Sequence, residues 1–321
     1  MSERKCKRRR VVVTGGAGFV GSHLCDALLE RGDAVTCVDN LTGCDGSTRN
    51  VDHLIGQPHF ELVVEDSLEW AAHADLRGVT YLFHNAASKS TRAQRNPELD
   101  LRVNAHTTLR LLLRAAEHGV TRFIHASTGS VFGRTDECHD DRLARDPVSL
   151  YGVSKLAAES YCRVVGEQFG LNVTVLRYYH VVGPRQSDSL GGGVVPIFVR
   201  RCLEGRPIVI HGSGEQVRSF TSVGDVVRAN LLVAESEAAC GLTFNCASGT
   251  QVTVRELAEF VAGELGNLHP FEFGPARPGD VMEFRVDNAP LRELGLSFDQ
   301  DWRSMVRGVI AAQRERQAAA V

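Results

Sequence analysis

The sequence lacks the long hydrophobic runs of membrane proteins and any strong excess of charge of one sign. No apolar stretch reaches the roughly 18 residues that a membrane-spanning helix requires. The net charge of −3 over 321 residues is too small to attract nucleic acid or an anionic membrane surface. The basic head "MSERKCKRRR" precedes a strand pattern and a glycine-rich turn instead of a signal segment, and we interpret it as a solvated tail. We therefore expect neither a membrane nor a nucleic-acid partner.

Paired cysteine spacings are also absent. The sequence has nine cysteines, but none forms a C-x-x-C motif, and several fall inside apolar strand patterns. An odd count without a regular framework favours reduced, buried thiols over disulfides or zinc ligation. We expect a cytoplasmic protein without a bound metal ion.

The first half of the sequence alternates regularly between short apolar runs and helical patterns. Strands are expected at residues 10–15, 34–40, 59–66, 79–87, 122–128 and 172–180, and helices at 22–32, 101–119 and 151–170. Such alternation is typical of a parallel sheet that is covered by helices on both faces. The predicted fold class is therefore α/β, with a Rossmann-type doubly wound parallel sheet.

The pattern changes after about residue 181, where a turn-rich segment is followed by mixed short helices and strands. A later strand, at 242–248, is expected to rejoin the sheet. We predict a smaller, partly interleaved C-terminal substrate domain. Residues 1–180 plus about 216–252 would form the nucleotide-binding domain, and about 181–215 plus 253–321 the second one.

A glycine motif stands between the first strand and the first helix. In "VVVTGGAGFVGSHL", Gly15, Gly18 and Gly21 have the spacing G-x-x-G-x-x-G, which permits a tight turn and a close approach of the backbone to a pyrophosphate. The helix N-terminus then offers amide donors to the phosphates. Asp39 ends the second strand, where a carboxylate accepts hydrogen bonds from ribose hydroxyls and repels a 2′-phosphate, so NAD is favoured over NADP. The alternative for Asp39 is an ordinary turn or helix-capping aspartate.

A tyrosine and a lysine one helical turn apart form the candidate catalytic set. In "YGVSK", Tyr151 and Lys155 are at positions i and i+4 of a predicted helix. Tyrosine normally ionises near pH 10, and a neighbouring ammonium would stabilise its phenolate. Upstream, Ser127 and Thr128 end a predicted strand, where their hydroxyls could orient a substrate oxygen. Without the dinucleotide motif, the Tyr-Lys pair would be read as part of an exposed helix face.

These residues resemble the extended short-chain dehydrogenase/reductases, the branch of NAD-dependent nucleotide-sugar epimerases and dehydratases. The resemblance covers nearly the whole chain and is carried by the ordered stretches "TGGAGFVG", "VDNL", "EDS", "HNAASK", "VNAHTTLRLLLRAA", "STGSVFG", "YGVSK", "RYYHVVGPRQ", "GSGEQVRSFTSVGDVVRA" and "ARPGDV". It implies an enzyme that retains NAD and oxidises C4 of a UDP-hexose or UDP-N-acetylhexosamine.

The resemblance also implies roles for individual residues. Cofactor binding is expected from Gly15, Gly18, Phe19, Val20, Gly21, Asp39, Asn40, Asp66, Ser67, Ala86, Lys89, Tyr151, Lys155 and Tyr178. Catalysis is expected from Thr128, Tyr151, Lys155 and His180, and substrate binding from Lys89, His180, Val194, His211, Arg218, Arg277 and Asp280. A homodimer through helices 98–118 and 151–169 is implied as well. Leu156, Cys162 and Val165 would form an apolar stripe there, although the same stripe could face the sheet.

A few sequence positions indicate which reaction follows the oxidation of C4. The 4,6-dehydratases of this family carry an Asp-Glu pair after the catalytic Thr, whereas this sequence has Gly129 and Ser130, so a 4,6-dehydratase is not expected. The common "VYG" is "VFG" here, with Phe132, and the common "RYFN" is "RYYH", which places His180 at a strand end.

A histidine that titrates near neutral pH could serve as acid or base for water loss from C6. The sequence then resembles the 5,6-dehydratases that make exo-glycal sugar nucleotides, such as the UDP-N-acetylglucosamine 5,6-dehydratase type of tunicamycin biosynthesis. If His180 only binds phosphate or backbone, the alternative is a UDP-sugar 4-epimerase. A non-catalytic NAD-binding sensor is a remote alternative, which the complete set of Thr128, Tyr151 and Lys155 disfavours.

Overall fold

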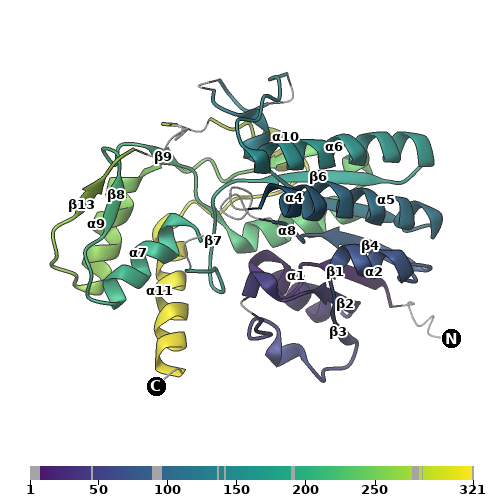
Figure 1. Cartoon of the computed structure of the whole chain (residues 1–321), viewed down its shortest axis with the longest axis horizontal. Coiled ribbons are helices and arrows are strands. Elements are labelled where there is room, and N and C mark those ends of the chain that lie inside the picture. Colours follow the sequence, from purple (N-terminus) through teal and green to yellow (C-terminus); the bar gives the residue numbers. More distant parts are fainter. Residues whose placement is uncertain are drawn as a thin grey trace.

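The computed structural model shows a large sheet-containing lobe and a smaller lobe beside it (Figure 1). The structure describes residues 8–44, 46–88, 96–135, 137–140, 142–188, 192–276, 282–283 and 285–319. Three predicted site residues, Lys89, Arg277 and Asp280, lie outside these ranges.

The larger lobe is built on a seven-stranded parallel sheet. Its strands lie in the order β11-β6-β5-β4-β1-β2-β3, the order expected of a doubly wound fold. The strands are β1 (Arg10–Thr14), β2 (Ala34–Asp39), β3 (Phe60–Val64), β4 (Val79–His84), β5 (Arg122–Thr128), β6 (Val173–Tyr178) and β11 (Thr243–Cys246). The order reverses at β1 and β4, so the carboxyl ends of these two strands open a crevice for a ligand.

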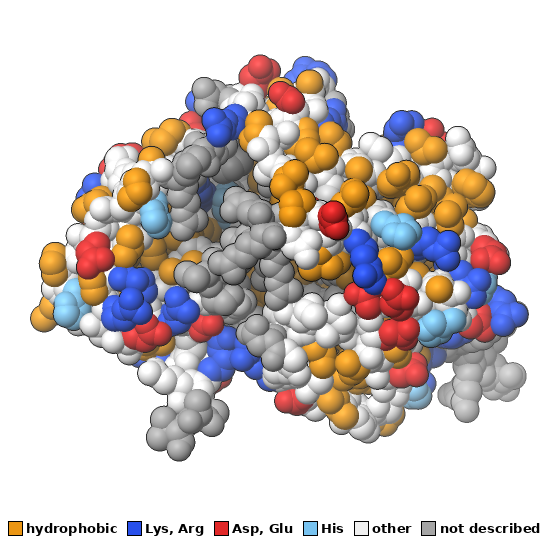
Figure 2. All heavy atoms as spheres, in the orientation of Figure 1, with side chains coloured by type: hydrophobic (Ala, Val, Ile, Leu, Met, Phe, Trp, Pro, Cys, Tyr) orange, Lys and Arg blue, Asp and Glu red, His pale blue; other side chains and the backbone are white. Residues whose placement is uncertain are grey.

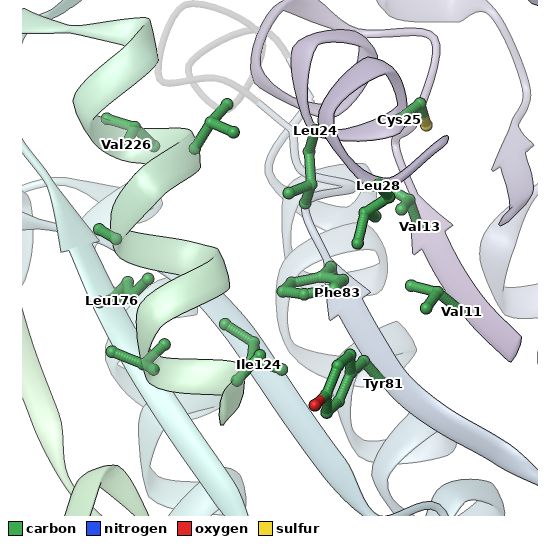
Figure 3. Packing of buried hydrophobic residues seen from close by; sticks show 14 of the residues in the cluster. Val11, Val13, Leu24, Cys25, Leu28, Tyr81, Phe83, Ile124, Leu176 and Val226 are labelled. Atoms are coloured by element: carbon green, nitrogen blue, oxygen red, sulfur yellow. The ribbon is translucent and has the colours of Figure 1, made fainter. Parts of the chain in front are cut away.

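Helices cover both faces of this sheet, because its strands carry apolar side chains on both sides. On one face, α1 (Phe19–Glu30) and α8 (Val223–Glu235) pack against strand residues such as Phe83, Ile124 and Leu176 (Figure 3). The other face is covered by α2 (Ser67–His73), α4 (Pro97–Leu101), α5 (Thr107–Glu117) and α6 (Leu150–Phe169). A Rossmann-type α/β fold is thereby confirmed.

The smaller lobe has a hydrophobic core of its own. Three helices, α7 (Val194–Leu203), α9 (Val254–Leu265) and α11 (Trp302–Ala319), enclose it, together with two short sheets. One sheet pairs β8 (Val209–His211) with β13 (Glu272–Gly274), and the other pairs β9 (Val217–Arg218) with β12 (Val252–Thr253). A further pair, β7 (Val181–Val182) and β10 (Thr221–Ser222), lies where the chain passes between the lobes.

The lobe boundaries differ in detail from the predicted ones. Phe220 and Val252, expected in the nucleotide-binding domain, pack in the core of the smaller lobe. Leu291 and Leu296, expected in the second domain, pack in the core of the sheet lobe, next to the short helix α10 (Ala289–Glu293). The chain therefore crosses between the lobes twice more than the sequence pattern indicated, because it returns to the sheet lobe at Leu291 and Leu296 before α11.

Two other sequence expectations are refined by the structure. The predicted helix 101–119 is α4 and α5 joined by a π-helical turn, Arg102–His106. Cys162 and Val165 face the sheet and are buried in its core, so they do not form the proposed dimer stripe. The eight described cysteines are free thiols, and the cytoplasmic location remains a prediction.

A truncation in the sheet core tests this packing. Phe83 is fully buried between α1 and α8, whereas Val64 at the end of β3 is 59% exposed. We expect Phe83→Ala to lower the free energy of unfolding by about 3–5 kcal/mol in urea titrations. Val64→Ala is the control and should change it by less than about 0.5 kcal/mol. Equal effects of the two substitutions would contradict the described core.

Candidate active site

The turn between β1 and α1 has no room for side chains. Gly15 adopts a φ of +67°, and a Cβ there would lie 2.6 Å from the backbone nitrogen of Ala86. A Cβ on Gly21 would lie 2.2 Å from the carbonyl oxygen of Gly15. The backbone of α1 is therefore held close to β1, and its first-turn N–H groups, which have no intrahelical acceptors, are available to an anion.

A pocket of about 370 Å³ opens beside this turn. It is lined by every described residue that the sequence assigns to the cofactor, namely Gly15, Gly18, Phe19, Val20, Gly21, Asp39, Asn40, Asp66, Ser67, Ala86, Tyr151, Lys155 and Tyr178. Asn85, Ser88 and Ser127, which were not predicted to bind the cofactor, also line it. The pocket runs from the glycine turn to the catalytic pair, as an elongated dinucleotide requires, so the residues fit NAD.

Asp39 has a second role that the sequence did not reveal. Its carboxylate accepts hydrogen bonds from the backbone N–H of Ala17 (3.0 Å) and of Leu41 (2.8 Å). Burial raises the pKa of this carboxyl, and the backbone donors oppose that shift. Asp39 thus holds the glycine turn in shape and also lines the pocket, where the sequence predicts the adenosine ribose. Next to it, Asn40 donates to Asp66, whose other oxygen caps α2.

The catalytic pair projects from the first turns of α6. Ser149 caps this helix by accepting the N–H of Gly152 (3.0 Å). The Tyr151 hydroxyl lies close enough to the Thr128 hydroxyl at the end of β5 to have its pKa lowered by it. The Lys155 ammonium donates to the carbonyl oxygen of Ala126 (2.9 Å). Thr128, Tyr151 and Lys155 are therefore assembled at one strand end.

Burial shifts the two catalytic pKa values toward the neutral forms. It raises the pKa of Tyr151 to about 12, against the opposing effect of the Thr128 hydrogen bond. It lowers the pKa of Lys155 to about 8, and the nearby Asp100 and Glu159 carboxylates oppose this shift. A phenolate at Tyr151 therefore needs positive charge beside it, which Lys155 can supply while it is protonated.

A buried ion pair fixes α6 against the sheet. Arg177 of β6 donates twice to Glu159 of α6 (2.9 and 2.7 Å), and Ser127 of β5 donates to the same carboxylate (2.5 Å). Both ends of this pair are almost fully buried. Sequence reasoning missed Glu159 because no local pattern distinguishes it from other helical glutamates.

His180 lies at the entry to the smaller lobe. Its φ of +36° is rare for a residue with a side chain, and its ring lies edge-on to Phe220. Burial, and to a lesser extent the Arg218 guanidinium, lower the pKa of His180 to about 3. The pKa of His180 thus lies well below the near-neutral value expected from the sequence, because the imidazole is buried beside a cation. The structure does bring His180 and Arg218 together.

The remaining predicted substrate residues are in the smaller lobe. Val194 is the first residue of α7, and His211 ends β8, where its Nδ1 contacts the carbonyl oxygen of Pro275 (3.2 Å). Among the described residues, no cluster of His, Cys, Asp or Glu could hold a metal ion. In the same ranges, no helix has the length and apolar character needed to cross a membrane.

Comparisons with known proteins agree with this geometry. Residues 11–247 match the NAD dependent epimerase/dehydratase family. The UDP-glucose 4-epimerase of Mycolicibacterium smegmatis is 35% identical over 294 residues, which cover 89% of this chain and 92% of that protein. The structure of UDP-glucose 4-epimerase from Thermotoga maritima with UDP-glucose has a TM-score of 0.88 at 32% identity and covers 96% of this chain and 99% of that one. The UDP-N-acetylglucosamine 4-epimerase of Methanobrevibacter ruminantium has a TM-score of 0.89 at 30% identity, with 97% and 99% covered.

The lowered pKa of Lys155 predicts a pH dependence of stability. Between pH 8 and pH 10 the unfolded lysine keeps a proton that the folded one has lost, so the folded state gains stability as the pH rises. Tyr151, whose pKa is raised, acts in the opposite direction only above pH 10. In denaturant titrations of protein stripped of nucleotide, we expect the parent to gain about 2 kcal/mol over this window relative to Lys155→Met. Parallel pH profiles of the two proteins would contradict the burial of this lysine.

Proposed function

Because this chain belongs to the NAD-dependent epimerase/dehydratase family, we propose that it is a UDP-sugar 4-epimerase, which oxidises C4 of a UDP-hexose or UDP-N-acetylhexosamine and returns the hydride to the opposite side. One observation carries this proposal: Thr128, Tyr151 and Lys155 are assembled, but the two residues after Thr128 offer no carboxylate. A Cβ on Gly129 would lie 2.2 Å from the ring of Tyr179, so the ring occupies the space that a side chain would need.

The catalytic residues can move one proton at the sugar O4. The hydroxyls of Thr128 and Tyr151 lie near each other, so an incoming hydroxyl can bind to both. Tyr151 then takes the O4 proton as hydride leaves C4, and returns it when the ketone is reduced. The Lys155 ammonium stabilises the phenolate meanwhile. NAD, when bound, supplies the hydride acceptor and donor.

One buried positive side chain favours a nucleotide diphosphate substrate. Arg218 is largely buried on β9, and its positive charge contributes to the lowered pKa of the His180 imidazole. A guanidinium suits a diphosphate because it donates two parallel hydrogen bonds. The solved neighbours that bind UDP-glucose or act on UDP-N-acetylglucosamine support a uridine sugar nucleotide as the substrate.

The second candidate function is 5,6-dehydration, with NAD regenerated and an exo-glycal product. The strained backbone of His180 favours it, because residues at such angles gather at functional sites. The low pKa of His180 opposes it, because a neutral imidazole of this kind is a poor acid and a weak base near pH 7. The role in antibiotic biosynthesis that dehydration would imply stays a prediction.

Incubation with UDP-glucose and with UDP-N-acetylglucosamine in D2O, followed by proton NMR, tests the reaction. We expect inversion at C4 with the C5 proton retained, because the described strand end has no group placed to remove that proton. Vinylic C6 protons would instead establish 5,6-dehydration and overturn the 4-epimerase proposal.

Two variants assign the residues in the same assay. Tyr151→Phe should retain NAD but lose at least about a hundredfold in rate, because it removes the proton acceptor. His180→Asn should raise KM while leaving kcat within a few-fold if His180 only binds substrate. Loss of kcat in His180→Asn would assign it to the chemistry.

The homodimer expected from the resemblance would use an apolar surface on α4, α5 and α6. Figure 2 shows hydrophobic side chains gathered over these helices. The exposed residues include Leu101, Leu113, Leu150, Val153 and Tyr161. They lie on the outer side of the helices, away from Cys162 and Val165. A second copy of the chain would remove this surface from water.

Charge on this surface should prevent the assembly. We expect the double variant Leu113→Glu/Tyr161→Glu to be monomeric by light scattering at concentrations where the parent is a dimer. Leu268→Glu is the control, since Leu268 is 96% exposed in the smaller lobe, away from these helices. A monomeric parent would refute the homodimer.

A further inference from the structure

A buried histidine stands in the loop that joins the catalytic strand to the catalytic helix. The loop leaves β5 after Thr128 and reaches α6 before Tyr151, and its residue His139 is only 1% exposed. The His139 backbone N–H donates to the carbonyl oxygen of Arg285 (2.8 Å). Its carbonyl oxygen accepts from the N–H of Asp287 (3.2 Å) and from the side chain of Asn245 (2.7 Å). This loop is thus paired with a segment of chain about 145 residues further on.

The imidazole of His139 contacts two aromatic residues next to the catalytic groups. Its Nδ1 is 3.0 Å from the hydroxyl of Tyr179, and its ring stacks on Phe132 with centroids 4.4 Å apart. Tyr179 immediately precedes His180, and its ring packs on Gly129, which immediately follows Thr128. Phe132 is the residue at which the sequence departs from the family's "VYG" pattern, and Tyr179 and His180 are those at which it departs from "RYFN".

The same contacts reach the helix that carries Tyr151 and Lys155. The Arg177 guanidinium lies over the Phe132 ring, 4.8 Å from its centroid, and is paired with Glu159 of α6. On the other side, Asn245 of β11 donates to both His139 and Asp287. His139 therefore lies where β5, β6, β11 and the 285–288 segment converge.

We propose that His139 is a positioning residue, which couples the catalytic strand ends to the 285–288 segment through its hydrogen bond to Tyr179 and its pairing with Arg285 and Asp287. We name His139, Tyr179, Phe132 and Asn245 the His139 clasp. The proposal deepens the proposed function and rests on it, because the groups being positioned are those for C4 oxidation.

The clasp can transmit displacement in both directions. The 285–288 segment follows, after three intervening residues, the stretch 277–281, which contains the predicted nucleotide-binding residues Arg277 and Asp280 and lies outside the described residues. A shift of that segment would move His139, and Tyr179 cannot follow without pushing on Gly129 and turning His180. The position of the 285–288 segment is thereby linked to the placement of Thr128. Because burial and Arg177 lower the pKa of His139 to about 4, the imidazole remains a neutral hydrogen-bonding group near pH 7.

Two single substitutions remove the central hydrogen bond from opposite ends. His139→Phe keeps an aromatic ring on Phe132, and Tyr179→Phe keeps the ring on Gly129, so both should fold. We expect each to lower kcat for C4 oxidation three- to tenfold, the worth of one neutral hydrogen bond, with the Kd for UDP unchanged within twofold. The double variant should be no slower than Tyr179→Phe, which lacks this bond and also the contact of the Tyr179 hydroxyl with Asn245 (3.5 Å).

Hydrogen exchange provides a readout that needs no turnover. In both variants, peptides covering 137–140 and 285–288 should exchange faster than in the parent, while peptides from β1 and β2 should not change. Tyr81→Phe is the matched control, because Tyr81 is a buried tyrosine on β4 outside the clasp. It should change neither exchange nor kcat.

The outcomes separate the two proposals. Unchanged exchange in both variants, or single effects on kcat that multiply in the double variant, would overturn the clasp. Faster exchange in the variants of a parent that converts no UDP-sugar would leave the coupling in place and refute the proposed function instead.

Discussion

The arrangement of the active site depends on the buried ion pair between Arg177 and Glu159. It joins β6 to α6, and Ser127 adds β5 to the same carboxylate. Thr128, Tyr151 and Lys155 come from the two elements, β5 and α6, that this carboxylate connects. Loss of either partner would leave an uncompensated charge in the interior, a cost far above that of an exposed pair. Apolar residues of similar volume can often replace a buried ion pair without loss of folding stability. The pair is therefore more important for positioning α6 against the sheet than for the net free energy of folding.

Burial disfavours the charged forms of both candidate catalytic side chains, Tyr151 and Lys155. It favours neutral Tyr151 and neutral Lys155, whereas the chemistry needs phenolate beside ammonium. A Tyr151 phenolate and a Lys155 ammonium would stabilise each other, so in the proposed reaction the removal of the O4 proton is favoured while Lys155 is charged. Asp100, buried near both groups, favours the lysine cation and disfavours the phenolate.

Three consecutive residues at the end of β6 lie in three different environments. Tyr178 lines the cofactor pocket, where its hydroxyl is bonded to Asn230. Tyr179 points to the opposite side, into the contact with His139 and Gly129. His180 leaves the extended conformation and lies beside Phe220 and Arg218 of the smaller lobe. Cofactor, catalytic strand end and substrate lobe are therefore adjacent, and substitutions within this tripeptide affect all three.

The sequence by itself determined the parallel sheet, the glycine turn and the Tyr151–Lys155 pair, because each depends on local spacing: apolar periodicity, a turn without Cβ atoms, and one helical turn. The strand at 122–128 and the helix that begins near residue 151 were predictable for that reason. Only the tertiary structure decided which polar groups are buried and beside what. Asp39 holds the glycine turn, Glu159 meets Arg177, His139 meets Tyr179, and His180 is enclosed beside Arg218. These contacts join residues from separate elements, and the pKa of a side chain follows from the burial and charges around it, which no local pattern encodes.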